Sequence, residues 1–425
     1  MIEPADLSAV EAARRIAAGS LSAEALVRSC LDRIAAREPQ VQAFEHLAAN
    51  EALRAARALD KAPSRGPLHG LPFAIKDNYD TWDMPTTSGS PIYAGNRPSA
   101  DAAVVALSRQ AGAVAVGKTV TTEFAYFTPG KTRNPHDPVR TPGGSSSGSA
   151  AAVGAGMVPL AFGSQTVGSV IRPAVFCGAA GYKPSFGLLP ATGIKALAWS
   201  YDTVGVMGRT VADCALLVGA LLGADWLAGL DGAGTPRIGL CRTLKWSEAQ
   251  PEAGPALDAT RRRCETSGAK VIEVEMPAGF AELYEAQPVV LAYEMAHVFA
   301  DEMARSRDKL SARFREQIER GQAIRHVEYA RAKAVLDTCR AQLGDLFDGC
   351  DVLMTPASPG EAPVGHGYTG NPIFNGVWTA LGVPCVTAPG LKGPNGLPVG
   401  VQAIGRIGDD ARTLAAAHWI EARLS

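Results

Sequence analysis

The sequence predicts an α/β protein, because segments with helical periodicity alternate with short apolar segments that are typical of strands. Residues 99–111 have the pattern of a helix, and the alternating residues 113–116 follow as a strand. The same order recurs later, with a strand over 237–241, a helix over 253–267 and another strand over 270–274. Each recurrence is one helix-to-strand step of a sheet covered by helices.

Two helices are expected to open the chain. Ser8 and Glu11 form a capping-box pattern at the start of the first helix. Val27, Leu31 and Ile34 recur at helical spacing in the second. We expect the two helices to form one packing layer.

A short apolar strand over residues 70–75 leads to Lys76 and Asp77. We therefore expect Lys76 at a strand end, where a sheet edge can place it in a site. The alanine-rich residues 150–156 predict a helix. The serines before this helix would then lie at its N-terminus, where backbone N–H groups favour negative charge.

The last third of the chain divides into a charged helical region and a set of apolar strands. Residues 290–348 have helical periodicity, and their charges predict a solvated face. The charged residues that define this face are Glu294, Arg305, Arg313, Glu316 and Arg320. Apolar segments bounded by proline or glycine at 352–356, 382–389 and 397–404 predict late core strands.

Length and composition predict one compact unit. The chain has 425 residues, is 47% hydrophobic and 20% charged, and has no long polar linker, so it can bury a substantial core. Its formal net charge of −1 gives no electrostatic footprint for nucleic acid or for an acidic membrane. A small molecule is therefore the expected partner, and we expect a monomer or a homodimer.

The cysteines and the N-terminus predict a cytoplasmic protein. The eight cysteines lie far apart, without the C-x-x-C spacing of a metal or redox site. The N-terminus lacks the pattern of a secretory signal, and the apolar runs are too short to span a bilayer. His136, His297 and His366 have no partner spacing for a metal. We predict neither a metal nor a cofactor.

Two motifs match known patterns but lack the surroundings that those patterns require. Residues 112–119 fit the phosphate-binding loop G-x-x-x-x-G-K-[ST], yet their alternating Ala and Val residues predict a strand. Residues 144–148 fit the nucleophile elbow G-x-S-x-G, which would make Ser146 the nucleophile. The elbow needs a preceding strand, whereas the three prolines within 133–143 indicate a loop.

A third set of motifs joins Lys76, Ser145 and Ser169. Lys76 lies in GLPFAIKD, Ser145 lies in GGSS before an alanine-rich run, and Ser169 follows Ser145 by 24 positions. With these motifs the sequence resembles the amidase signature family over most of its length. Further matches are GKT at 117–119, EF at 123–124, FCG at 176–178, GYKP at 181–184, SYDTVG at 200–205, GVP at 382–384 and GLPVGVQ at 396–402.

The resemblance implies the amidase signature fold, a large mixed β-sheet core covered by helices on both faces. The chain is then a single amidase domain over residues 1–425. Its signature core is expected at about 60–220, a variable region that shapes the substrate site at about 225–350, and C-terminal core strands at 351–425.

The resemblance also implies a Ser-cisSer-Lys triad that needs neither metal nor organic cofactor. Ser169 is expected to be the nucleophile, while Ser145, in a cis peptide, bridges it to Lys76 and passes protons both ways. Lys76 must be neutral to act as a base, so its pKa has to fall from the usual value of about 10.4. The backbone N–H groups expected to form the oxyanion hole are those of Thr166, Val167, Gly168 and Ser169.

Three positions near the nucleophile depart from the common family pattern. Val167 replaces the first of two glycines, Gln165 stands where aspartate is frequent, and the arginine is displaced to Arg172. Because valine is β-branched, the oxyanion hole requires a backbone without positive φ at Val167. The displacement makes Arg172 less suited than the usual arginine to bind a substrate carboxylate.

Asp202 has two interpretations. It either orients the lysine network or makes a structural hydrogen bond at a turn. The second is favoured, because Asp before Thr readily bonds to the local backbone.

The predicted function is hydrolysis of a C–N bond other than a peptide bond, through an acyl-enzyme on Ser169. No acidic or basic constellation surrounds the motifs, so the expected substrate is a small neutral amide, aromatic amides included. Carbamate, anilide and ester hydrolysis use the same chemistry. The residues expected to bind substrate are Tyr126, Phe127, Gly144, Phe374 and Trp378.

Two alternatives from other classes remain. The first is an ammonia-producing protein that resembles the A-subunit of a glutamine amidotransferase, and the displaced Arg172 and the shortness of the chain argue against it. The second is a catalytically silent scaffold, which the intact Lys76, Ser145 and Ser169 argue against.

Overall fold

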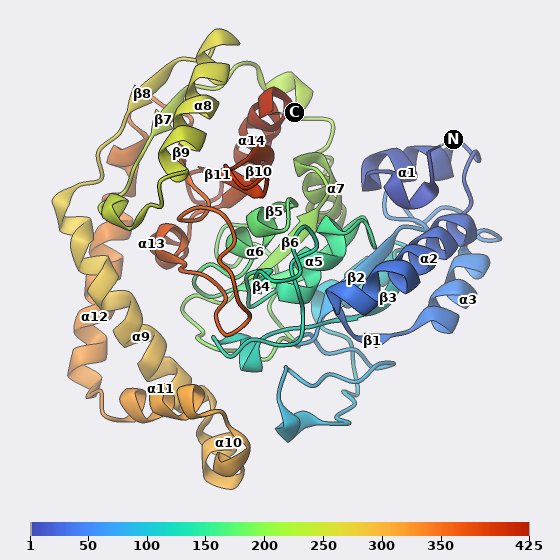
Figure 1. Cartoon of the computed structure of the whole chain (residues 1–425), viewed down its shortest axis with the longest axis horizontal. Coiled ribbons are helices and arrows are strands. Elements are labelled where there is room, and N and C mark those ends of the chain that lie inside the picture. Colours follow the sequence, from blue (N-terminus) through green and yellow to red (C-terminus); the bar gives the residue numbers. More distant parts are fainter. Residues whose placement is uncertain (1, 425) are drawn as a thin grey trace.

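The fold is built on one large mixed sheet (Figure 1). The structure is a computed structural model of the chain, and residues 2–424 are described. Eleven strands hydrogen-bond in the order β1-β3-β2-β4-β6-β5-β10-β11-β9-β7-β8. Their bounds are β1 (Phe44–Leu47), β2 (Pro72–Lys76), β3 (Val114–Thr119), β4 (Leu160–Gln165), β5 (Ala180–Lys183), β6 (Thr203–Gly208), β7 (Ile238–Leu240), β8 (Val271–Glu273), β9 (Val352–Pro356), β10 (Cys385–Lys392) and β11 (Pro398–Ile404).

Fourteen α-helices within residues 2–424 surround this sheet. Their bounds are α1 (Ala9–Ala17), α2 (Ala23–Val41), α3 (Ala49–Leu59), α4 (Ala103–Gln110), α5 (Ser147–Gly154), α6 (Ile171–Phe176), α7 (Val211–Leu222), α8 (Ala253–Thr266), α9 (Leu283–Val298), α10 (Ala300–Arg305), α11 (Ala312–Gln322), α12 (His326–Ala341), α13 (Ile373–Leu381) and α14 (Asp410–Leu424). The α/β prediction is confirmed.

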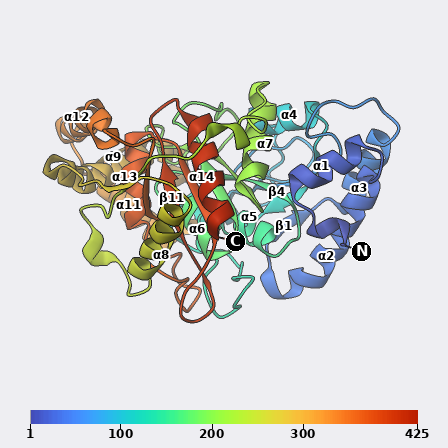
Figure 2. The same ribbon diagram turned by 90° about the horizontal axis from the view of Figure 1, so that it is seen from above.

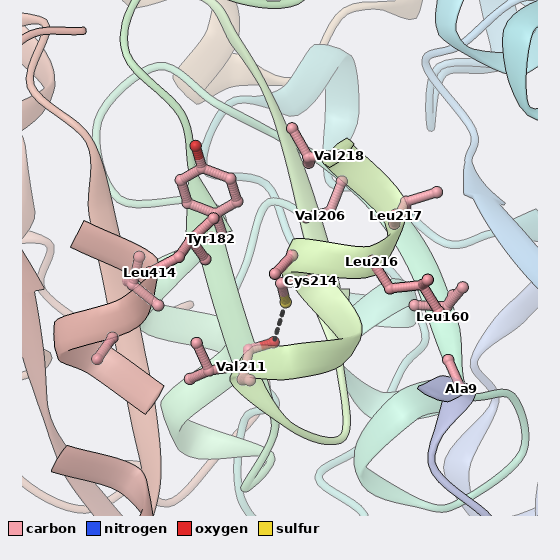
Figure 3. Close-up of a cluster of buried hydrophobic side chains, with 14 of the residues drawn as sticks. Ala9, Leu160, Tyr182, Val206, Val211, Cys214, Leu216, Leu217, Val218 and Leu414 are labelled. Atoms are coloured by element: carbon pink, nitrogen blue, oxygen red, sulfur yellow. Dashed lines mark hydrogen bonds between the residues drawn. The ribbon is translucent and has the colours of Figure 1, made fainter. Parts of the chain in front are cut away.

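Both faces of the sheet are covered by helices. Phe73 and Ile75 of β2 pack in one apolar cluster with residues of α7 and α14, whereas Ala74 between them packs with α2 and α5. Successive side chains of a strand point to opposite faces, so β2 is buried on both. Figure 3 shows part of the first cluster, where Val206 of β6 and Leu414 of α14 lie near α7.

The parallel strands β2 and β4 position the site. β2 pairs with β4 in register, with Ile75 opposite Phe162. Their C-terminal ends therefore lie at one edge of the sheet, so Lys76 lies close to the segment that follows Gln165. This edge is where ligands bind in open α/β sheets.

Helices α9–α12 form an arm at the opposite end of the molecule from α1–α3 (Figures 1 and 2). The prediction of a solvated face on this region is confirmed for four residues, Arg305, Arg313, Glu316 and Arg320. It is wrong for Glu294, which is fully buried. The carboxylate of Glu294 accepts hydrogen bonds from Ser200 N at 2.9 Å and Tyr329 OH at 3.0 Å, and these partners make its burial tolerable.

Most predicted elements are confirmed, with shifted ends. β9 has the predicted bounds, and Ser8 caps α1 by accepting a hydrogen bond from Glu11 N at 3.1 Å. α5 begins at Ser147, not at residue 150, because Ser146 O already accepts the first helical hydrogen bond. β10 begins at Cys385, because Gly382 ends α13 with a φ of 76°.

No helix within the described residues has both the length and the apolar character needed to cross a membrane.

Candidate active site

Lys76 is the last residue of β2 and is fully buried. Its Nζ donates to Ser145 Oγ at 2.7 Å and to Ser164 Oγ at 2.9 Å. Asn78 Nδ2 donates to the same Ser164 oxygen at 3.1 Å. The end of β2 thus delivers a lysine amine directly to a serine hydroxyl.

Ser145 lies in the loop before α5, and the peptide bond between Gly144 and Ser145 is cis. The carbonyl of Ser145 accepts a hydrogen bond from Thr122 N at 3.3 Å. A side chain at Gly144 would lie only 2.9 Å from a methyl carbon of Thr369, so the loop has no room for a larger residue there.

Ser169 lies in the turn between β4 and α6 and is 8% exposed. Its carbonyl accepts a hydrogen bond from Ser146 N at 3.3 Å, which places the turn against the serine loop. A hydrogen bond joins Lys76 to Ser145, whereas none among residues 2–424 joins Ser145 Oγ to Ser169 Oγ. Ser169 lines a small cavity, the Ser169 cavity, together with Tyr126, Phe127, Val167, Arg172 and Leu291.

The turn after β4 presents backbone N–H groups without acceptors. No backbone hydrogen bond in the described part of the chain uses the N–H of Thr166, Val167, Gly168 or Ser169. Thr379 Oγ1 donates to Val167 O at 2.7 Å and fixes that peptide. Val167 is not among the non-glycine residues with positive φ, so its branched side chain fits this turn. Such fixed donors can stabilise an oxyanion.

Gln165 holds the start of α6. Its Oε1 accepts hydrogen bonds from Val170 N at 2.8 Å and Ile171 N at 3.0 Å, and its Nε2 donates to Thr379 Oγ1 at 2.9 Å. One oxygen of Gln165 thus accepts hydrogen bonds from two N–H groups at the start of α6, which lack partners within the helix.

Gln165→Ala is expected to lower the free energy of unfolding by about 1–3 kcal/mol, because it leaves buried donors without partners. Urea unfolding measures this change. Gln322→Ala, at an exposed position of α11, is the control and should change stability by less than about 0.5 kcal/mol. Equal losses in the two variants would contradict this role of Gln165.

Asp202 connects the turn after β4 to the segment before β6. Its Oδ1 accepts a hydrogen bond from Thr166 Oγ1 at 2.6 Å, and its Oδ2 accepts from Leu197 N at 2.6 Å and Ala198 N at 3.0 Å. Burial raises the pKa of Asp202 to about 6, and these donors oppose the shift. The structural interpretation of Asp202 accounts for these bonds, and its charge also acts on Lys76.

Burial lowers the pKa of Lys76 to about 7, and the charge of Asp202 partly opposes this shift. The neutral fraction of Lys76 therefore rises as the pH increases through 7. If neutral Lys76 is the base, kcat/KM should rise through about pH 7 and then level off. A pH–rate profile with a non-titrating substrate measures this, and a flat profile from about pH 6 to 9 would contradict it.

Arg172, in α6, is a buried cation at the Ser169 cavity. Its Nη2 donates to Gly144 O at 2.6 Å and to Thr369 Oγ1 at 3.3 Å. Its Nε and Nη1 have no hydrogen-bond partner within residues 2–424. Burial lowers the pKa of Arg172 to about 10, so the side chain stays charged at neutral pH.

The five residues expected to bind substrate have different surroundings. Tyr126 and Phe127 line the Ser169 cavity, and the carbonyl of Gly144 is occupied by Arg172. Phe374 and Trp378 are fully buried instead. Phe374 packs near Trp246, Trp378 lies in the apolar cluster with α9, and neither lines the Ser169 cavity.

The two rejected motifs have structural roles. Lys118 lies inside β3, where its Nζ donates to Tyr79 O at 2.7 Å and pairs with Asp77 at 3.3 Å. Ser146 Oγ donates to Ser164 O at 3.3 Å and accepts from Ser164 N at 3.2 Å. The described residues contain no group of His, Cys, Asp and Glu side chains suited to a metal.

Ser164, which bonds Lys76, and Asn78, which bonds Ser164, were not predicted from the sequence. Their signal was weak, since each is a single polar residue at the edge of an apolar segment. The parallel pairing of β2 with β4 brings Ser164 to Lys76 and Asn78.

The chain is similar to known proteins in sequence and in fold. The Amidase family model matches residues 25–414. The chain is 34% identical to the A-subunit of glutamyl-tRNA(Gln) amidotransferase from Anaeromyxobacter sp. (strain K), over 97% of this chain and 95% of that protein. Peptide amidase from Stenotrophomonas maltophilia has a TM-score of 0.83 and 30% identity, covering 99% of this chain and 97% of its own. A structure described as a vestigial protein complex that reveals the evolutionary origins of an s-triazine catabolic enzyme has a TM-score of 0.90 and 29% identity. The match covers 99% of this chain and 100% of that chain. The chain belongs to the amidase signature family.

Proposed function

We propose that this protein is an amidohydrolase that cleaves a C–N bond through an acyl-enzyme on Ser169. The observation that carries the proposal is the 2.7 Å hydrogen bond between Lys76 Nζ and Ser145 Oγ. It is made in a buried site where the lysine has a pKa of about 7. A base with such a pKa can take up and return a proton at neutral pH.

In the proposed reaction, neutral Lys76 takes the hydroxyl proton of Ser145. Ser145 takes that of Ser169 while Ser169 Oγ attacks the carbonyl carbon. The charge that develops on the carbonyl oxygen is stabilised by the N–H groups of residues 166–169. The proton then returns through Ser145 to the nitrogen, the C–N bond breaks, and the acyl group stays on Ser169 until water releases it.

Trapping of the acyl-enzyme tests this function. The protein is incubated with a panel of amides, quenched in acid and digested, and the peptide that carries Ser169 is weighed by mass spectrometry. The expected result is release of amine together with an acyl mass on Ser169. Release of amine with an acyl mass on another residue, or no release from any amide, would overturn the proposal.

The Ser169 cavity is the proposed place of the acyl group. Tyr126 and Phe127 line it with rings 4.9 Å apart in an edge-to-face arrangement. The cavity has a volume of only about 20 Å³, so it favours the small amide expected from the sequence and has no room for an aromatic acyl group. Carbamates, anilides and esters present a similar carbonyl and stay within the proposal.

Two nitrogens of Arg172 have no hydrogen-bond partner within residues 2–424 and are closed off from the Ser169 cavity as it stands. Because a buried cation without a counter-ion is costly, an acyl group whose carboxylate opens a path to these nitrogens is favoured over a neutral one, contrary to the expectation drawn from the displacement of Arg172. Half-amides of short dicarboxylic acids should therefore be better substrates than neutral amides of the same length. Arg172→Met is expected to lower kcat/KM for the acidic substrate by about 10- to 100-fold, because hydrogen bonds to a charged group contribute about 1.5–3 kcal/mol. Steady-state kinetics on the matched pair measures this selectivity.

The neutral substrate is the control for Arg172→Met. Equal losses on the acidic and neutral substrates would mean that Arg172 only holds Gly144 in place. A wild-type preference for the neutral substrate would support the neutral amide predicted from the sequence.

A second candidate function is production of ammonia from glutamine within a multi-protein complex. The relative from Anaeromyxobacter favours it, since that protein is the A-subunit of an amidotransferase. The alignment spans 95% of that relative, and its 475 positions exceed the 425 residues of this chain. The chain is therefore shorter within the alignment, and the expectation that its length argues against this role stays a prediction. The isolated protein distinguishes the candidates. Turnover of several amides by a homomeric preparation supports the hydrolase, whereas turnover of glutamine alone, and only with partner proteins, supports the second candidate.

A further inference from the structure

A second and larger cavity adjoins the Ser169 cavity. Its volume is about 330 Å³, which falls within the range of roughly 300–1,000 Å³ for small-molecule sites. Ala125, Thr166 and Leu197 line both cavities. The two cavities therefore lie against the same three residues, and Thr166 of the turn after β4 is one of them.

The polar part of this second cavity contacts the proton relay. Ser164 lines it, and Ser164 Oγ accepts the 2.9 Å hydrogen bond from Lys76 Nζ. Asn78 and Asp202 line it as well, bonded to Ser164 and Thr166 respectively. Arg172 and Ser169, in contrast, line only the Ser169 cavity. Ser164, the partner of Lys76, therefore lies between the lysine and the second cavity, while Lys76 and Ser145 are not in its lining.

The walls of the second cavity are apolar. The apolar lining includes Phe186, Leu189, Pro190, Ile194, Leu197 and Trp199. The cation in the lining, Lys195, is paired with Glu302 of α10 and donates to Tyr93 OH at 3.2 Å. Phe186 is 43% exposed and Trp199 is 47% exposed, so the cavity opens to solvent between apolar side chains.

The chemistry of amide cleavage decides which part of a substrate can lie there. When the C–N bond breaks, the nitrogen keeps the bonding electron pair and takes a proton from Ser145. The hydroxyl of Ser145 is hydrogen-bonded to Lys76. The leaving nitrogen must therefore face the relay, and its substituent must continue on the lysine side. The acyl substituent continues from the carbonyl carbon into the Ser169 cavity.

We propose that the second cavity receives the substituent of the leaving nitrogen, so that the enzyme cleaves secondary amides with an apolar N-alkyl or N-aryl group. This inference rests on the proposed function of Ser169 and specifies its substrate class. The polar floor suits the amine product, because the carboxylate of Asp202 lies in the lining.

The test compares two substrates that share one acyl group, a primary amide and its N-benzyl amide. Ala196 lines the second cavity and is half-buried, so Ala196→Trp fills the cavity. It is expected to lower kcat/KM for the N-benzyl amide about tenfold or more, the scale at which pocket shape discriminates substrates. The primary amide should change by less than about threefold. Ala228→Trp, at an exposed position outside both cavities, is the control and should affect neither substrate.

The outcomes separate this inference from the proposed function. If the wild type cleaves the primary amide but Ala196→Trp spares the N-benzyl amide or affects both amides equally, the inference alone is overturned. If the wild type cleaves neither amide, nor any other of the panel, the proposed function fails. Ala191→Trp, at an exposed position on the same cavity, gives the same test should Ala196→Trp misfold. Inhibition by free benzylamine is a second measurement, and its inhibition constant should rise in the filled variants.

Discussion

Ser169→Ala is expected to lower kcat for amide hydrolysis by about 10⁴-fold or more, because it removes the atom that carries the acyl group. The change deletes one oxygen from a side chain that makes no hydrogen bond among residues 2–424, so the fold should remain intact. Steady-state kinetics measures the loss, and thermal unfolding checks the fold.

Ser146→Ala is the matched control, since Ser146 is the nucleophile of the rejected elbow. Its hydroxyl is bonded to Ser164 N and O, so the variant should lose about 1–3 kcal/mol of stability and still acylate Ser169. Catalysis that survives Ser169→Ala but is abolished by Ser146→Ala would contradict the assignment of the nucleophile.

Lys76→Met has the second largest expected effect. Methionine keeps most of the side-chain volume but removes the amine that bonds Ser145, so kcat/KM should fall by about 10²–10⁴-fold, the usual contribution of a positioned base. The rise of kcat/KM through about pH 7 should disappear with it. Two effects on stability oppose each other: the variant removes the hydrogen bonds to Ser145 and Ser164, and it also removes a buried amine whose charged form is disfavoured by folding.

Lys118→Met is the control, because Lys118 is also a fully buried lysine. It pairs with Asp77, so its removal leaves a buried carboxylate without a counter-ion and should cost about 3–5 kcal/mol of stability. The pH profile should keep its shape. A profile that loses its rise in Lys118→Met but keeps it in Lys76→Met would contradict the assignment of the base.

The apolar and alternating patterns of short segments were enough to predict several strands. The apolar run at Val352–Pro356 and the alternating segment in Val114–Thr119 are strands, because burial on both faces of a sheet requires such runs. These local patterns did not predict burial that depends on residues distant in the sequence. Nothing near Glu294 indicates burial, since its donors come from Ser200 and Tyr329.

The candidate site could be predicted only in part, for the same reason. Family motifs identified Lys76, Ser145 and Ser169, and the structure brings the first two into direct contact. The second cavity could not be predicted, because its walls include the irregular segment 186–199, which lacks periodicity. Trp378 was expected at the substrate and lies in the core, since aromatic residues next to a motif fill cores just as often.

Labelling with a fluorophosphonate probe tests the central claim most directly. The adduct is located by peptide mass spectrometry, and the labelling rate is compared between the wild type and Lys76→Met. We predict a single adduct on Ser169 that forms much more slowly in Lys76→Met. An adduct on Ser146, or labelling of Ser169 at the same rate in both proteins, would contradict a serine nucleophile activated by Lys76.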